Sequence, residues 1–170
     1  MTNNMTHHTA IRRAAVADAE RLAVIYNYYI AHTTVSFEED TITPAMMQQR
    51  IADVRAGGYE WFVLEDENGI QGYAYAARWK TREAYRFTAE ATVYLDPECK
   101  GKGYGTQLYQ VLFDDLRKRS IRSVMGVVTL PNPASAALHE KFGMKKVAHF
   151  SEVGFKFNEW LDVGFWQGML

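Results

Sequence analysis

A glycine-rich turn over residues 100–106 constrains the fold of this chain more than any other stretch. It holds three glycines at alternate positions and joins two segments of different periodicity. Before the turn, Thr88–Leu95 alternates as a strand does, and Asp96-Pro97 ends it. After the turn, apolar residues recur at helical spacing, which predicts a helix from about Tyr104 to Arg119. The turn therefore lies between a strand and the first residues of a helix.

This arrangement is typical of a phosphate-binding turn. A helix start presents unpaired backbone N–H groups, and glycines let an anion approach them closely. Lys100 and Lys102 add positive charge beside those groups. The spacing fits neither the Walker pattern nor the Rossmann pattern. The alternative is a glycine-rich turn that binds no ligand. Three glycines at alternate positions lose much conformational entropy on folding, and a turn without a ligand would not need them.

Length and composition favour a single domain. The 170 residues predict one domain over 10–170, preceded by a polar, disordered leader at 1–9. Hydrophobic residues make up 48% of the chain without an apolar run of membrane length, so no membrane partner is expected. The net charge of −1 argues against nucleic acid as a partner. The single Cys99 excludes an internal disulfide and a cysteine zinc site, so we expect no metal and a cytoplasmic protein.

Periodicity and breaker residues predict an α/β fold around the glycine turn. Asn68-Gly69 between two apolar runs predicts a β-hairpin, and the strand after the central helix is expected to return parallel to the one before it. The sheet is therefore predicted to be mixed, mostly antiparallel, with a central parallel βαβ unit and flanking helices. The expected strands are Ile11–Ala14, Tyr59–Glu65, Ile70–Ala77, Thr88–Leu95, Val124–Thr129, Val147–Phe157 and Asp162–Leu170, and the remaining helices are Ala17–Ala31, one from Thr43-Pro44 to Gly57-Gly58, and Ala134–Phe142.

This element order resembles the GNAT acetyltransferase superfamily. Lys100-x-x-Gly103-x-Gly105 is similar to its acetyl-CoA motif, with lysine as a mild departure at the first place. A narrower resemblance, to the phosphinothricin N-acetyltransferase family, runs from about Ile11 to Gln167. It is carried by Thr34-Val35-Ser36-Phe37, Trp79-Lys80-x-Arg82-x-Ala84-Tyr85-x-x-Thr88-x-Glu90-x-Thr92-Val93-Tyr94, Leu130-Pro131-Asn132, Leu138-His139-Glu140 and Trp160-Leu161-Asp162-Val163-Gly164-Phe165-Trp166.

The resemblance implies a GNAT fold, acetyl-CoA as cosubstrate and an amino-acid analogue as acetyl acceptor. Members of the narrower family acetylate the α-amino group of phosphinothricin, and relatives prefer methionine sulfoximine or methionine sulfone. The implied coenzyme-binding residues are Val93, Tyr94, Leu95, Lys100, Gly101, Lys102, Gly103, Tyr104, Gly105, Thr106, Asn132 and Ser135. The expected substrate-binding residues are Ser36, Phe37, Tyr75, Lys80, Thr81, Arg82, Tyr85, Glu90, Ala91 and Thr92.

Two titratable residues are the candidate catalytic groups. A substrate ammonium must lose a proton before it attacks, and Glu90, just before the coenzyme turn, is the expected base. His139 stands where the superfamily commonly has a tyrosine acid, so it is expected to contact the amine or return a proton to the sulfur. The alternatives are a Glu90 that pairs with Arg86 or Lys80 and a His139 that is simply packed.

Substrate choice is expected to depend on the basic loop that contains Lys80 and Arg82, because such cations suit an oxygen-rich head group. A solvated surface loop is the alternative. Aromatic residues near the C-terminus suggest a homodimer interface, as the family implies. Two other functions stay open: a related acetyltransferase for another small amine, and a non-catalytic acyl-CoA sensor.

Overall fold

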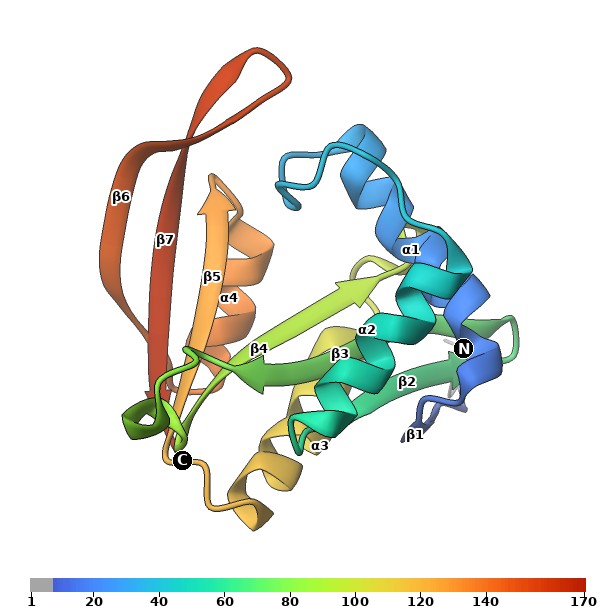
Figure 1. The fold of residues 1–170 in the computed structure, drawn as a ribbon. Coiled ribbons are helices and arrows are strands. Elements are labelled where there is room, and N and C mark those ends of the chain that lie inside the picture. The colour runs from blue at the N-terminus through green and yellow to red at the C-terminus, as the bar shows by residue number, and fades with distance from the viewer. Residues whose placement is uncertain (1–7) are drawn as a thin grey trace, which may run out of the picture.

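A computed structural model describes residues 8–170 as one seven-stranded sheet with helices on both faces (Figure 1). The predicted leader, 1–9, falls mainly outside the described residues, while the Thr9 hydroxyl donates to Gln107 Oε1 at 2.7 Å. The strands are β1 (Ala10–Arg13), β2 (Trp61–Asp66), β3 (Gly69–Arg78), β4 (Thr88–Leu95), β5 (Ser123–Leu130), β6 (Lys145–Lys156) and β7 (Glu159–Met169). The α-helices are α1 (Ala19–His32), α2 (Pro44–Ala56), α3 (Tyr104–Lys118) and α4 (Pro133–Lys141).

The predicted mixed α/β class is confirmed, and the strand order is β1-β2-β3-β4-β5-β7-β6. All neighbouring strands are antiparallel except β4 and β5, which are parallel. The helix α3 connects this parallel pair, as the sequence predicts. The position of β7 between β5 and β6 was not predicted, because hydrophobic periodicity does not determine strand order.

The element boundaries differ from the predicted ones mainly at the two ends of the chain. A 3₁₀ turn over Val16–Asp18 precedes α1, so the helix begins at Ala19 rather than Ala17. The last hairpin is longer than predicted, because β6 begins at Lys145 and β7 at Glu159. Its polar and apolar residues alternate irregularly, and two register shifts interrupt the ladder.

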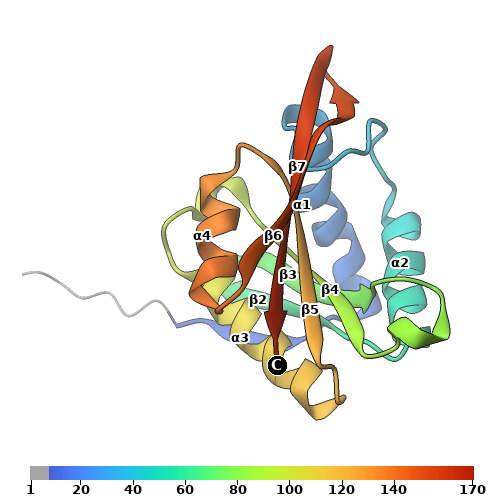
Figure 2. The same cartoon turned by 90° about the vertical axis from the view of Figure 1, so that its left-hand side faces the viewer.

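The two helix pairs cover opposite faces of the sheet (Figure 2). One apolar core lies beneath α1 and α2 and includes Leu22, Met47 and Tyr73. The other lies beneath α3 and includes Leu112 and Val124. Residues of β3 and β4 alternate between these cores, so a short stretch of β4 presents side chains to both faces.

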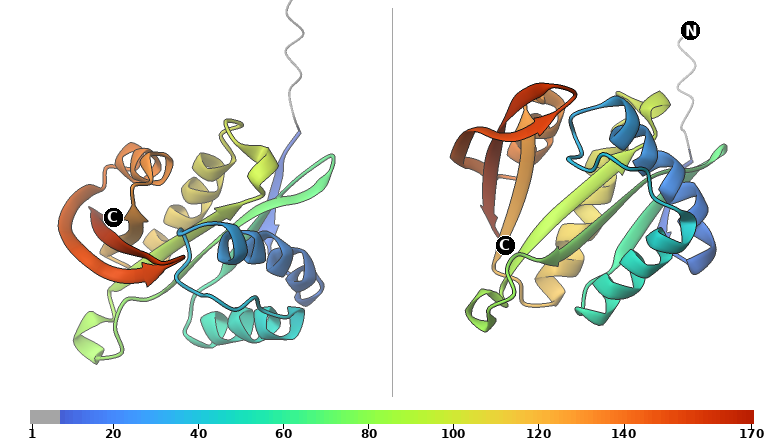
Figure 3. Two further views of the ribbon diagram at one scale, coloured as in Figure 1. Left: turned by 90° about the horizontal axis from the view of Figure 1, so that it is seen from above. Right: turned by 45° about the horizontal axis from the view of Figure 1, so that its top comes forward.

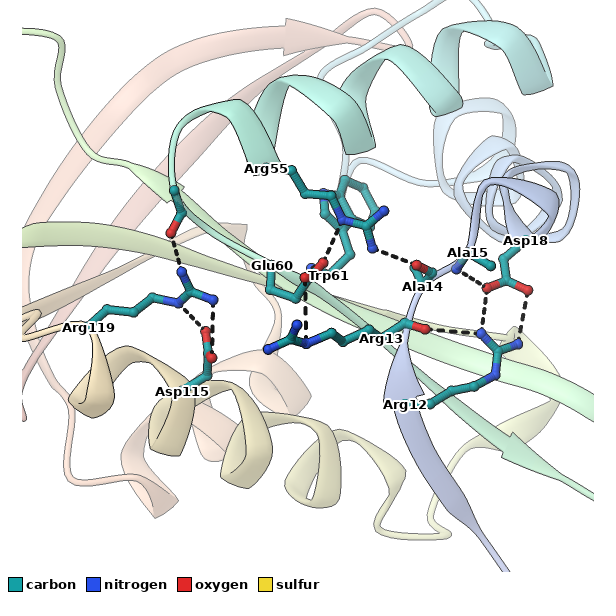
Figure 4. Close-up of polar contacts among 11 residues, drawn as sticks. Arg12, Arg13, Ala14, Ala15, Asp18, Arg55, Glu60, Trp61, Asp115 and Arg119 are labelled. Carbon is teal, nitrogen blue, oxygen red and sulfur yellow. Dashed lines mark hydrogen bonds and ion pairs between the residues drawn. The ribbon is translucent and has the colours of Figure 1, made fainter.

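Ion pairs fasten the helices to the N-terminal half of the sheet (Figure 4). Arg12 of β1 pairs with Asp18 at 2.7 Å and with Glu65 of β2 at 2.6 Å. Glu60, just before β2, accepts from Arg55 of α2 at 2.7 Å. These partly buried contacts hold the start of α1 and the end of α2 against the sheet.

Candidate active site

The parallel strands β4 and β5 separate halfway along their length. Their ladder pairs only Thr88–Glu90 with Ser123–Met125, although β4 continues to Leu95 and β5 to Leu130. We call the gap between residues 91–95 of β4 and 126–130 of β5 the fork (Figure 1). A cavity of about 450 Å³ occupies it. It is lined by Tyr26, Val35, Ser36, Phe37, Glu38, Glu90, Ala91, Thr92, Val93, Tyr94, Tyr109, Val127, Val128, Thr129, Asn132, Ser135, His139 and Val163.

The cavity connects the two faces of the sheet. Alternation along β4 directs Ala89 and Ala91 to the core beneath α3, whereas Tyr94 contacts Tyr26 and Tyr29 of α1. Because side chains alternate along a strand, Glu90 and Thr92 point to the same face as Tyr94, the face that α1 covers. Tyr109 and His139 line the cavity from the α3 and α4 side. Two substrates can therefore meet through the sheet, one from each face.

Backbone groups of β4 are available at the fork. Asp96 N donates to Gln71 O, and Trp79 N donates to Thr88 O, so even-numbered residues face β3. By alternation, the backbone groups of Val93 and Leu95 face the fork, where β5 offers no ladder partner. The Leu95 carbonyl already accepts from the Tyr29 hydroxyl at 2.6 Å. Of the three predicted coenzyme-binding residues on β4, Val93 and Leu95 direct their backbone groups to the fork, while the backbone groups of Tyr94 face β3.

The start of α3 has the form expected of an anion cradle. Gly101 and Gly103 have φ of 79° and 77°, a conformation that favours glycine. The first helical bond runs from Gln107 N to Gly103 O, so the amides of residues 104–106 have no partner within the helix. Gly103 supplies no side-chain cap, whereas Thr43 caps α2 and Asn132 caps α4. The start of α3 is therefore left open to a ligand.

The predicted coenzyme-binding residues around the cradle differ in which of their groups remain free to contact a ligand. Lys100 and Lys102 are exposed, which suits phosphate contact. The Tyr104 ring is buried, and its hydroxyl donates to Asp66 Oδ2 at 2.9 Å, so only its amide faces a ligand. Thr106 Oγ1 accepts from Lys141 at 3.3 Å. Asn132 Oδ1 accepts from Ser135 N at 3.1 Å, which leaves the Asn132 amide hydrogens for another contact.

Glu90 occupies the vertex of the fork in a half-buried position. Burial raises the pKa of its carboxyl, and the positive charge of Lys80 acts in the opposite direction. Within residues 8–170 no ion pair to Glu90 is formed, and Arg86 is near Glu83 instead, at 3.9 Å. A carboxylate with a raised pKa is a stronger base than one in water. The site thus offers a proton acceptor that is not already used by a neighbouring cation.

His139 is held in one tautomer. Its Nδ1 lies 2.6 Å from the Ser135 carbonyl oxygen, and because a carbonyl only accepts, Nδ1 carries the hydrogen. In the neutral ring Nε2 then accepts from the Tyr109 hydroxyl at 3.2 Å. Burial lowers the pKa of His139, which favours this neutral form. In that state His139 has no Nε2 hydrogen to give to a leaving thiolate.

The room for the His139 ring comes from Gly126 of β5. A Cβ at Gly126 would lie 2.1 Å from His139 Nε2, so any larger residue would displace the ring. Tyr109 was not among the predicted site residues, because its place in the apolar stripe of α3 predicts a core position. Its burial and the nearby charge of Glu90 both raise the pKa of the Tyr109 hydroxyl, which stays protonated.

Half of the ten predicted substrate-binding residues line the cavity, Glu90 among them. Ser36, Phe37, Ala91 and Thr92 also line it. Tyr75 does not. Its ring is stacked on Trp61 at 3.9 Å between centroids, behind the cavity wall.

A charged pair that the sequence did not indicate lies at the same wall. Glu38 lines the cavity and pairs with Arg50 of α2 at 2.5 Å, while the guanidinium lies over the Tyr26 ring. The two residues are twelve positions apart and on different elements, so no spacing rule links them. They add a carboxylate and a cation to the α1 side of the cavity.

The basic loop is not brought into the cavity. Lys80, Thr81, Arg82 and Tyr85 are exposed and do not line it. Part of the loop's positive charge is neutralised by Glu83, which pairs with Arg78 at 2.8 Å. Lys80 lies over the Trp79 ring, and its charge still acts on Glu90. Among residues 8–170, no cluster of side chains could hold a metal ion.

A forked sheet with an open helix start on one face and a half-buried carboxylate on the other fits an acetyl-CoA-dependent transferase. Comparison with known proteins agrees, because residues 11–164 match the acetyltransferase (GNAT) domain family. This chain belongs to the GNAT acetyltransferase family.

Relatives within that family resemble the chain over most of its length. A phosphinothricin N-acetyltransferase from Streptomyces viridochromogenes is 38% identical over 92% of this chain and 85% of its own. An L-methionine sulfoximine/L-methionine sulfone acetyltransferase from Pseudomonas paraeruginosa is 36% identical over 93% of this chain and 92% of its own. The crystal structure of a Sinorhizobium meliloti phosphinothricin acetyltransferase in complex with acetyl-CoA matches with a TM-score of 0.92 and 34% identity, over 95% and 88% of the two chains.

Proposed function

We propose that this enzyme transfers the acetyl group of acetyl-CoA to the α-amino group of a small amino-acid analogue of the phosphinothricin, methionine sulfoximine or methionine sulfone type. The observation that carries the proposal is the position of Glu90, half-buried at the vertex of the fork and without an ion-pair partner among residues 8–170. The names of the relatives support the substrate class.

Each group at the fork has a distinct task in a direct transfer. Bound acetyl-CoA supplies a thioester. Glu90 accepts the proton of the substrate ammonium, so that the free nitrogen can form the new C–N bond as the C–S bond breaks. The amides of Val93 and Leu95 stabilise negative charge on the carbonyl oxygen. The open amides at 104–106, with Lys100 and Lys102, hold the diphosphate, and Asn132 and Ser135 flank the pantetheine arm.

The neutral His139 suits a proton-shuttling role. Its Nε2 can take the second proton of the attacking nitrogen and then give that proton to the departing sulfur, which balances the reaction. The Tyr109 hydroxyl assists in both states, since a hydroxyl donates to neutral Nε2 and accepts from protonated Nε2. Ser36, Phe37, Ala91 and Thr92, which line the cavity, are assigned to the substrate around its amine, and Tyr75 lies behind them. The exposed Lys80, Thr81, Arg82 and Tyr85 are assigned to the substrate head group from outside the cavity.

The proposal includes a homodimer in the cytoplasm. The C-terminal hairpin of β6 and β7 exposes Val147, Phe150, Val153, Phe155, Phe157 and Trp160. A patch of this kind is costly to leave in water and is typical of an interface. Cys99 is buried as a free thiol, which fits a reducing compartment. Light scattering of the chain and of Trp160→Glu tests the dimer, and a monomeric parent chain would exclude it.

The decisive experiment is thiol release from acetyl-CoA with four acceptors: methionine sulfoximine, methionine sulfone, phosphinothricin and spermidine. Turnover with one or more of the first three supports the proposal. Turnover with spermidine alone would indicate another amine specificity. Tight acetyl-CoA binding without release for any amine would indicate a non-catalytic sensor.

A further inference from the structure

Lys156 is a buried lysine that the proposed chemistry does not use. It is the last residue of β6 and is only 2% exposed. Its ammonium donates to the Ile30 carbonyl at 2.8 Å and to the Ser36 carbonyl at 2.6 Å. Ile30 belongs to the last turns of α1, where carbonyl dipoles favour a cation. A buried ammonium needs such partners, because an unpaired one would carry a large desolvation cost.

The bonds from Lys156 join two halves of the molecule that the fork separates. Figure 3 shows the tip of the hairpin beside the segment that follows α1. We call residues 33–38 of that segment the acceptor wall, because Ser36, Phe37 and Glu38 line the cavity there. Within residues 8–170, the hydrogen bond between the acceptor wall and the hairpin runs from the Lys156 ammonium to the Ser36 carbonyl.

A second contact supports the wall from the same hairpin. A Cβ on Gly154 would lie 2.3 Å from Phe37 Cζ, so the ring lies directly against the β6 backbone. The φ of Gly154 is not in the left-handed region, so close packing rather than backbone conformation requires glycine there. Ser36 is 4% exposed, and its Oγ lies 2.9 Å from the Tyr26 hydroxyl. The wall is thus fixed on the α1 side by Tyr26 and on the hairpin side by Lys156 and Gly154.

We propose that Lys156 is a positioning residue for the acceptor substrate: by tying the acceptor wall to the C-terminal hairpin, it sets the width of the amino-acid half of the fork. The coenzyme half lies on the opposite face of the sheet and does not depend on this tie. The proposal rests on the proposed function for the identity of the substrate, but the tie itself can be measured without turnover.

The test compares Lys156→Met with Lys145→Met, a matched change at an exposed lysine of the same strand. Lys156→Met is expected to raise the KM for methionine sulfoximine about tenfold, with kcat and the Kd for acetyl-CoA changed less than about twofold. Lys145→Met is expected to change none of these. An unchanged KM, or equal changes in the amino-acid KM and the acetyl-CoA Kd, would overturn the proposal.

A second variant guards against a folding defect in the first. Gly154→Ala displaces Phe37 through a different contact on the same hairpin side of the wall, and it is expected to raise the same KM while acetyl-CoA binding is retained. If both variants lose acetyl-CoA binding, the effect is global and the proposal is wrong. Hydrogen exchange of amides 33–38 tests the tie without an activity measurement. The exchange should be faster in Lys156→Met and unchanged in Lys145→Met. If the parent protein is inactive but amides 33–38 still exchange faster in Lys156→Met, only the proposed function is refuted.

Discussion

Glu90 and Met125 form the last residue pair of the parallel ladder between β4 and β5. Beyond this pair the two strands separate, so the carboxylate lies where the sheet opens into the cavity. The Glu90 carboxylate is therefore both partly shielded from water and accessible to a substrate, since the closed ladder covers one side of it and the fork exposes the other.

Replacement of Glu90 should remove the base without removing the coenzyme site. Glu90→Gln is expected to lower kcat by about 10²–10⁴-fold, because the amide cannot accept the ammonium proton. The Kd for acetyl-CoA should stay within about twofold, since the cradle at α3 is on the other face. Steady-state kinetics and calorimetric titration measure the two quantities. An unaltered kcat would exclude Glu90 as the base.

The same substitution should stabilise the fold at neutral pH. Burial raises the pKa of Glu90 above 4.5, so between that value and the raised one the folded chain holds a proton that the unfolded chain lacks. The contribution of this group to stability is therefore fully present below 4.5 and is lost as the pH rises through the folded pKa. The Tm of Glu90→Gln relative to the parent should increase from about pH 4 to about pH 7. A constant difference would show that the carboxyl is not desolvated.

Gly126 and His139 should be energetically coupled through the ring that lies over the glycine. Gly126→Ala places a methyl group where Nε2 now lies, and it should cost about 1–3 kcal/mol of folding free energy and lower kcat. The same change in a His139→Ala background should cost much less, because the clashing ring is gone. Urea unfolding of the four proteins of this cycle gives the coupling energy, and strictly additive losses would contradict the contact.

The exposed basic loop allows a test of its assigned role. Arg82→Ala is expected to raise the KM for the amino acid more than the KM for acetyl-CoA, because the guanidinium is assigned to the acceptor's oxygens. Since the residue is exposed, the difference should shrink as ionic strength rises. Kinetics at low and high salt measure this. Equal effects on both substrates would mean that Arg82 does not bind the acceptor.

Local features of the site follow from the sequence. The alternation of Thr88–Leu95, the glycines of the turn and the apolar spacing of α3 predict a strand, a glycine turn and a helix start, and all three are present. These features depend on residues close together in the chain, where backbone sterics and side-chain period decide the conformation. Family resemblance added the coenzyme and the substrate class to that local pattern.

The tertiary structure decided which distant residues share the cavity. It joined Tyr109 to His139, Glu38 to Arg50 and Lys156 to Ser36, and it left the loop of Lys80 and Arg82 at the surface. These outcomes depend on how helices, connecting segments and strands pack against one another, which no periodicity encodes. Sequence determined the elements and the chemistry they carry, whereas packing between elements determined the shape of the site, because long-range contacts depend on how whole faces fit together.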